Sequence, residues 1–337
     1  MPATPALRRK QIELQVALIT PLIHVKGYAA PETTAAAERG RLLIEQAETL
    51  GESPEDPLLL FSVLFAIWSM SYAAFDGDLM CELSAEFLAL AERQGTTVPL
   101  MIGHRIVGIS LMLTGDLAEG RTHLDRAIAL YDPTEHRPLA TRFGVDARMA
   151  VLSYRSRALW LLGYPDAALT DSDQALSDAR AVGQAATLMY ALGHAPLTFF
   201  QCGNYATANE IFDELTALAD EKGTLLWKAL GMMNQGWLFA LMSKASEAVH
   251  MITSGIAALR STGATLWVPL LLSYLARSDA ELGQFDDAWR CIGEATKAVE
   301  TRKEKWCAAE VSRISVAMQP ERGRLCRDRC GTAGGYW

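Results

Sequence analysis

The residues of this chain that could do chemistry do not form a catalytic set. Its histidines stand alone, with no second histidine or cysteine at ligand spacing, so none predicts a metal site. Two carboxylate pairs, Asp76 with Asp78 and Asp171 with Asp173, lack the further oxygen ligands of a calcium loop. The sequence contains neither the Gly-Lys of a phosphate-binding loop nor a Gly-x-Ser-x-Gly elbow. We therefore expect no enzyme, no cofactor, and no catalytic or metal-binding residue.

Charge and cysteine content narrow the class of protein further. A net charge of −8 gives no general attraction to phosphate backbones or anionic lipid, so we expect no nucleic-acid partner and no membrane partner. Only Cys326 and Cys330 lie close together, and they lack the other ligands of a zinc site. No apolar signal segment follows the charged N-terminal residues. These features are typical of a reduced, cytoplasmic protein.

One uncharged run, residues 57–75, is just long enough to cross a bilayer as a helix. Asp56 and Asp76 flank it, and no Lys or Arg stands beside it as an interfacial anchor. We interpret the run as a buried helix of a water-soluble fold.

A recurrent turn sets the organisation of the chain. It occurs at Gly77-Asp78-Leu79, Gly115-Asp116-Leu117, Gly163-Tyr164-Pro165, Gly203-Asn204-Tyr205, Ser243-Lys244-Ala245 and Gly283-Gln284-Phe285. The spacings are 38, 48, 40, 40 and 40 residues, and periods of this size predict stacked helical hairpins. Glycine at such a turn ends one helix in the left-handed conformation, after which the next helix folds back antiparallel.

The turns and the apolar periodicity place the helices, with no strand pattern anywhere. First helices are expected near 58–75, 98–113, 139–162, 185–201, 225–241 and 265–281, and second helices near 78–94, 117–131, 165–181, 205–221, 245–261 and 285–301. An earlier hairpin is expected near 8–25 and 32–50, and a last helix from Glu304. Two prolines between residues 131 and 138 predict an irregular loop.

The predicted fold is all-α, a right-handed superhelical solenoid of antiparallel hairpins of about 40 residues. We expect a disordered start over residues 1–7, an array of about seven hairpins plus a last helix over 8–314, and a non-repeat tail over 315–337. The tail after Ser315 has four Arg, two Cys and four Gly and no amphipathic pattern, so we expect it to be disordered.

The turn, with Gly, an apolar residue two positions on, and small residues further along, resembles the tetratricopeptide repeat. Several phrases also resemble the C-terminal repeat region of bacterial proteins that join an adenylate or guanylate cyclase domain, or a transcriptional activator, to a predicted ATPase. These phrases are Lys26-Gly27-Tyr28-Ala29-Ala30-Pro31, Ala129-Leu130-Tyr131-Asp132-Pro133 with His136, Leu159-Trp160-Leu161-Leu162-Gly163-Tyr164-Pro165, and Glu304-Lys305-Trp306. The resemblance runs from about residue 5 to 314.

In that family the cyclase and nucleotide-binding domains precede the repeats, and the repeats continue in helices beyond the position that matches Ser315. The resemblance therefore implies that the catalytic domains are absent from this chain and that its end is truncated or frameshifted.

In the register of the tetratricopeptide resemblance, the first helices line a concave face and carry the contact residues. The expected partner-binding stripe is Arg105, Arg157, Trp160, Tyr190, Phe200, Gln201, Trp237, Arg277 and Glu281. Arg157 and Arg277 are the sharpest candidates, because an arginine on an apolar helix face can bind a peptide carboxylate or a phosphate. The alternative for each is a salt bridge to a neighbouring helix.

Two functions remain open. The array is a non-catalytic protein-interaction or regulatory scaffold with a protein or peptide partner, and the resemblance implies an ATPase or cyclase domain as that partner. Alternatively, its concave groove senses a small ligand. A deep pocket beside aromatic and arginine side chains would favour the small ligand, and a broad shallow groove would favour a peptide or domain.

Overall fold

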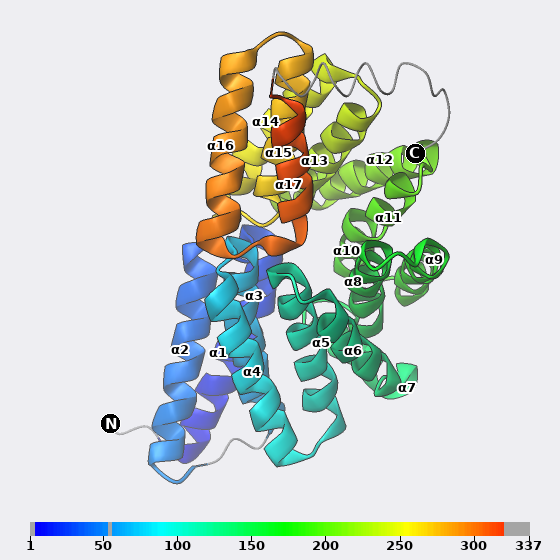
Figure 1. Cartoon of the computed structure of the whole chain (residues 1–337). Helices are drawn as coiled ribbons and strands as arrows, with labels where there is room; N and C mark the ends of the chain where they lie inside the picture. The colour runs from blue at the N-terminus through cyan, green and yellow to red at the C-terminus, as the bar shows by residue number, and fades with distance from the viewer. Residues whose placement is uncertain (1–3, 53–55, 320–337) are drawn as a thin grey trace.

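The computed structural model describes residues 4–52 and 56–319, which fold into helices joined by turns, without a strand (Figure 1). The helices are α1 (Pro5–Lys26), α2 (Pro31–Thr49), α3 (Leu58–Ala74), α4 (Gly77–Gln94), α5 (Thr97–Thr114), α6 (Leu117–Ala129), α7 (Pro133–His136), η1 (Arg137–Thr141), α8 (Ala147–Leu161), α9 (Pro165–Val182), α10 (Ala185–His194), α11 (Pro196–Gln201), α12 (Tyr205–Lys222), α13 (Leu225–Leu241), α14 (Ala245–Ser261), α15 (Val268–Glu281), α16 (Phe285–Arg302), η2 (Lys305–Cys307) and α17 (Ala308–Ala317). The predicted all-α solenoid of helical hairpins is confirmed.

Consecutive helices pair as the turns predicted, for example α5 with α6, α8 with α9 and α13 with α14. The turn residues Gly115, Gly163, Gly203, Ser243 and Gly283 all have positive φ, as a helix-ending residue in the left-handed conformation requires. The first turn differs from the prediction. Its left-handed residue is Phe75, with φ of 47°, and not Gly77, which opens α4. Phe75 stands 40 residues before Gly115, so the period is more regular than the glycines alone indicate.

Three predicted elements need correction, each because of a local backbone constraint. The expected helix over 185–201 is divided into α10 and α11, since Pro196 cannot donate the intrahelical hydrogen bond at that position. The expected loop over 131–138 instead forms α7 and η1, because Asp132 caps the turn and Pro133 stands at its first position. The helix predicted from 139 therefore begins only at Ala147.

The predicted boundaries of the array also shift by a few residues. Helix α1 begins at Pro5, where Thr4 caps it, so residues 5–7 belong to the array and not to a disordered start. Helix α17 extends to Ala317, three residues beyond the predicted limit of 314. The rest of the expected tail, with Cys326 and Cys330, lies outside the described residues.

Two apolar helices lie inside the solenoid. Among the described residues, α5 is long and apolar enough to cross a membrane, and 67% of it is buried. Helix α3, which contains the uncharged run, has 17 residues and supplies side chains to two hydrophobic clusters. One cluster joins α3 to α1 and α2, and the other extends from α3 to α17. Both helices are thus core helices, as we predicted for the uncharged run.

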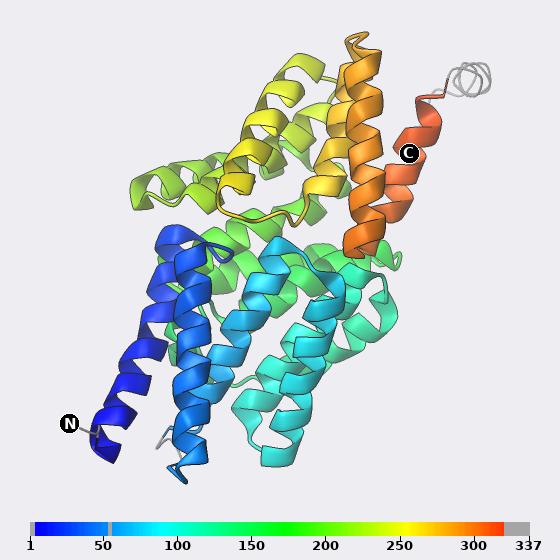
Figure 2. The same cartoon turned by 90° about the vertical axis from the view of Figure 1, so that its left-hand side faces the viewer.

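The two ends of the superhelix contact each other. The backbone N–H groups of Thr265 and Leu266, in the loop before α15, donate to the Ala73 carbonyl at 2.8 and 3.1 Å. The Thr265 hydroxyl donates to the Ala74 carbonyl at 2.5 Å, and the Arg302 guanidinium donates to the same oxygen at 3.0 Å. Figures 1 and 2 show α1–α6 in one half of the molecule and α13–α17 in the other, joined along one side by α8–α12.

Glycines allow the backbones to approach closely at this closure. A Cβ atom on Gly77 would lie 2.8 Å from the Arg302 carbonyl oxygen, and one on Gly263 would lie 2.8 Å from the Ala29 carbonyl oxygen. Distances this short exclude a side chain unless the backbone moves. Closure therefore depends on residues without side chains at both ends of the array.

We predict that Gly77→Ala lowers stability, because its methyl group would push α16 away from α4. The expected loss is about 1–3 kcal/mol, measured as the free energy of unfolding in urea. The matched control is Gly293→Ala. This glycine lies exposed within α16, and a Cβ atom there would have nothing within 4 Å, so alanine should raise stability by about 0.5–1 kcal/mol through helix propensity. Equal stability changes in the two variants would show that the closure contact is not tight.

Candidate functional site

Closure turns the concave face into an interior lined by aromatic side chains. The Tyr72 and Tyr154 hydroxyls, from α3 and α8, form a hydrogen bond with each other. His194 of α10 packs against Tyr190, with ring centroids 4.4 Å apart, and against Trp267, at 5.9 Å. Residues from four separate hairpins therefore meet at one place. We call Tyr72, Tyr154 and Tyr190 the tyrosine cluster.

Arg157 lies beside the tyrosine cluster with only 2% of its surface exposed. Its guanidinium carbon stands 4.1 Å from the ring centroid of Trp267 and 5.5 Å from those of Tyr154 and Trp306. Nη2 is buried without a hydrogen-bond acceptor, and no carboxylate of the described residues pairs with this arginine. Burial lowers the pKa of Arg157. Aromatic faces contact this charge through cation–π interactions.

Arg105 of α5 is a second interior arginine, with 3% of its surface exposed. Its guanidinium carbon lies 5.2 Å from the ring centroid of Phe65, and Nε and Nη1 are buried without an acceptor. Arg155, two residues from Arg157 on α8, shows the usual arrangement of an arginine paired with carboxylates. It donates to both carboxylate oxygens of Asp171, at 2.7 and 2.8 Å, and to Asp125 at 2.9 Å. The two interior arginines have no such partner in the described parts of the chain.

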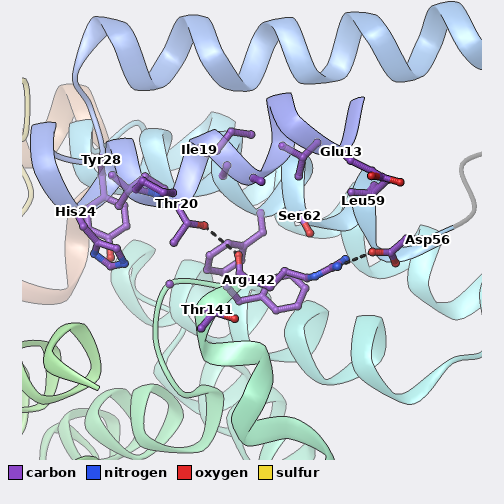
Figure 3. Close-up of a pocket in the computed structure, with 18 of the residues that line it drawn as sticks. Glu13, Ile19, Thr20, His24, Tyr28, Asp56, Leu59, Ser62, Thr141 and Arg142 are labelled. Carbon is purple, nitrogen blue, oxygen red and sulfur yellow. Dashed lines mark hydrogen bonds and ion pairs between the residues drawn. The ribbon is translucent and has the colours of Figure 1, made fainter. Parts of the chain in front are cut away.

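A half-open cavity of about 600 Å³ lies between α1, α3 and residues 141–144 (Figure 3). Its wall is apolar around Leu59 and Phe65, and Glu13, His24 and Ser62 are among its polar residues. Arg142 reaches across from the 141–144 segment to form an ion pair with Asp56, as Figure 3 shows. We call this space the outer cavity. A concave space of this size that combines apolar walls with polar groups can hold a ligand.

The outer cavity borders the interior through two aromatic side chains. Phe65 forms part of its wall and also carries the Arg105 guanidinium against its ring. Tyr28, in the turn between α1 and α2, lines the outer cavity and also a small interior cavity of about 30 Å³ beside Tyr72, Tyr190 and His194. Tyr28 therefore separates the outer cavity from the small interior cavity, and Phe65 separates the outer cavity from Arg105.

The structure divides the nine predicted contact residues into separate groups. Tyr190 belongs to the tyrosine cluster, Arg157 packs against its member Tyr154, and Arg105 packs against Phe65. Phe200 and Trp237 pack on each other in the core, with ring centroids 4.6 Å apart. The expectation that these five side chains are exposed is wrong. Contacts between neighbouring helices bury Phe200 and Trp237, and Arg157 is covered by Trp267 and Trp306 from the C-terminal end of the array.

The remaining four predicted residues do not join this interior group. Arg277 pairs with Glu281 one turn along α15, at 3.0 Å. This ion pair lies within one helix and is not the salt bridge to a neighbouring helix that was the alternative. Trp160 and Gln201 are half-buried near the ends of α8 and α11. The predicted stripe is thus not one continuous surface.

Sequence reasoning missed Tyr28, Tyr72 and Tyr154, because only closure brings these distant residues together.

The sequence analysis also treated every histidine as isolated. His104 and His123, on α5 and α6, contact each other through their Nδ1 atoms at 3.0 Å. Burial, with the neighbouring imidazole, lowers the pKa of His104 to about 4. The antiparallel pairing of these two helices could have indicated this contact. Among the described residues no group of three or more potential ligands could hold a metal ion.

Comparison with known proteins identifies the fold and no family. No protein-family model matches the chain, and no curated protein matches its sequence. The structure of NprR in complex with its cognate peptide NprX has a TM-score of 0.58 at 11% sequence identity, covering 96% of this chain and 86% of that one. The apo form of the quorum sensor NprR from B. thuringiensis has a TM-score of 0.50 at 12% identity, covering 86% and 77%. The likeness shows a shared helical-repeat fold.

Glu304 is a fully buried carboxyl group beside the tryptophans that contact Arg157. Its Oε1 accepts hydrogen bonds from the Trp267 backbone N–H and from Trp306 Nε1, each at 3.1 Å. Burial raises the pKa of Glu304 to about 8, and these hydrogen bonds offset only part of that effect. At neutral pH the group is therefore mostly protonated and does not neutralise Arg157.

The raised pKa of Glu304 predicts a loss of stability as the pH rises. The ordinary pKa of the group is 4.5, and its pKa in the folded state is about 8. Between these two pH values the folded state holds a proton that the unfolded state lacks, so the free energy of unfolding falls as the pH rises. Glu304→Gln stays neutral and keeps the acceptor oxygen. Its melting temperature should exceed that of the parent chain by about 2–4 °C at pH 9 and match it at pH 5. Thermal unfolding at both pH values checks this, and an equal deficit at both would contradict it.

Proposed function

We propose that this chain is a non-catalytic regulatory module that binds a short peptide in the outer cavity and the adjoining interior. The observation that carries the proposal is the outer cavity itself, which opens to solvent at one side and borders the buried Arg105 at the other. Its volume of about 600 Å³ suits a few amino-acid residues and not a folded domain.

The chemistry of the site supports peptide binding. Apolar walls at Leu59 and Phe65 can take side chains, while Glu13, Thr20 and Ser62 offer polar contacts for a peptide backbone. The Thr20 hydroxyl donates to the Arg142 carbonyl at 3.2 Å, so the two sides of the cavity already contact each other. A bound peptide would replace or extend this bridge and could thereby change the spacing of α1 and the 141–144 segment.

The similar solved structures support the same class of ligand. NprR is described as a quorum sensor and has been solved with its cognate peptide NprX. We extend peptide binding from that protein to this chain as part of the proposal. The regulated partner is proposed to be an ATPase or cyclase domain, as the sequence resemblance implies, and the location is proposed to be the cytoplasm.

A small-molecule ligand is the second candidate. The outer cavity favours it in one respect, since a deep pocket stands beside aromatic and arginine side chains. The volume alone suits either class of ligand. A peptide is favoured because the cavity remains open at one side, so a chain longer than the cavity can still enter.

Filling the outer cavity tests the proposal. Ala17 is an exposed residue of α1 that lines the cavity, and Ala17→Trp should weaken peptide binding at least about tenfold, or about 1.4 kcal/mol. The measurement is affinity selection from a synthetic library of random heptapeptides, followed by titration of the selected peptides. The matched control is Ala257→Trp, at an exposed position on α14, which should bind like the parent chain. Unchanged binding in Ala17→Trp would show that peptides do not use this cavity.

A further inference from the structure

Helix α1 has apolar side chains on two opposite faces. Its inner face is buried against α2 and α3 through Ile12, Val16, Ile19 and Ile23. Its outer face carries four large apolar side chains that are 59%, 61%, 47% and 71% exposed, namely Leu7, Leu14, Leu18 and Val25. Among the described residues, no other helix has more than two exposed side chains of this kind. A helix that is apolar on both faces is typical of one that is buried on both faces.

The outer face of α1 follows a seven-residue pattern. Steps of four and three residues alternate along it, at positions 7, 11, 14, 18, 21 and 25. This spacing keeps one narrow row of side chains on the same side of a helix, and it is the pattern by which two helices pack against each other. We call these six exposed residues the outer stripe: Leu7, Gln11, Leu14, Leu18, Pro21 and Val25.

The outer stripe is complementary to itself when two copies run antiparallel. Its positions are symmetric about residue 16, so a second copy turned end for end places Leu7 against Val25 and Leu14 against Leu18, as a two-fold contact requires. Gln11, the polar member, then faces Pro21, whereas parallel copies would bury two Gln11 side chains against each other. Antiparallel helices also bring the opposite ends of their dipoles together.

The charge and the size of the outer stripe also suit a second copy. Lys10 and Lys26 lie near its two ends and pair with Glu13 and Glu32 at 3.0 and 3.5 Å, so the contact would not set unpaired positive charges against each other. The stripe is about 27 Å long, at 1.5 Å per residue. A helix pair of this length buries about 600 Å² on each copy, and the total of about 1,200 Å² is the lower limit of specific, stable interfaces. The expected dimer is therefore weak.

We propose that the outer stripe is the interface of an antiparallel homodimer, in which α1 of one copy packs against α1 of the other. Figure 2 shows α1, in dark blue, at the outer edge of the molecule, where no other element of the described chain covers the stripe. Pro21 also lines the outer cavity, so the interface borders the proposed peptide site. The dimer does not require a bound peptide, because the stripe is exposed without one.

Sedimentation of the full chain at increasing concentration tests the dimer. Between about 1 and 200 µM, we expect the average mass to rise from that of one copy, 36.8 kDa, toward twice that value. Leu14→Glu and Leu18→Glu each place a charge at two equivalent positions of the contact, so each should weaken the dimer at least about a hundredfold. The matched control is Leu225→Glu, at an exposed leucine of α13, which should leave the dimer unchanged. All three leucines are exposed in a single copy, so the melting temperatures at about 1 µM should match that of the parent chain.

Cysteine cross-linking tests the orientation of the two copies. Leu7→Cys and Val25→Cys chains, mixed and oxidised, should form more disulfide dimer than the parent chain. Either variant alone should not, because the two equivalent cysteines of an antiparallel pair would be about 27 Å apart. A disulfide requires Cα atoms within about 7 Å.

Three results would contradict the proposal. A chain that stays monomeric up to about 200 µM would overturn the dimer. A Leu14→Glu dimer as tight as that of the parent chain would show that the copies meet through another surface. A disulfide in Leu7→Cys alone would show parallel copies. Peptide binding in the outer cavity is tested separately, by Ala17→Trp, and none of these three results decides it.

Discussion

The contact of the α3–α4 hairpin with the last hairpin, α15–α16, is the constraint on which the interior of this protein depends. Hydrogen bonds from Thr265 and Arg302 to the end of α3 hold the superhelix closed. A solenoid of this kind otherwise presents its first helices along an open concave face. Here the closure removes that face from solvent, so the same helices supply a core and a small polar interior.

Closure also explains why the polar groups of the interior stand in unusual environments. Arg157 is held between aromatic rings, and the neighbouring carboxyl of Glu304 stays mostly protonated at neutral pH because it is buried. A fold selected only for stability would place apolar side chains at such positions. Retained buried charge is typical of sites where function opposes stability.

The features that could be predicted from the sequence are those that depend only on residues close together in the chain. The left-handed residue that ends a helix is a local feature, so Gly115 and the later turn residues were enough to locate most hairpins. The first turn is the exception, since tertiary context places its left-handed residue at Phe75. Pro196 divides a helix that periodicity alone could not divide. Arg157 was predicted as a contact residue on an exposed face, yet it is buried. Its burial depends on Thr265 meeting Ala74, 191 residues away in sequence, and no single-sequence pattern reports such a contact.

Small-angle X-ray scattering of the unliganded chain tests the closed superhelix most directly. A compact chain of this length has a radius of gyration of about 20 Å. The closed superhelix predicts a value of about 20–22 Å and a scattering curve that fits the closed arrangement. A radius above about 25 Å, as an extended repeat array would give, would contradict closure and would return the arginines to an exposed concave face.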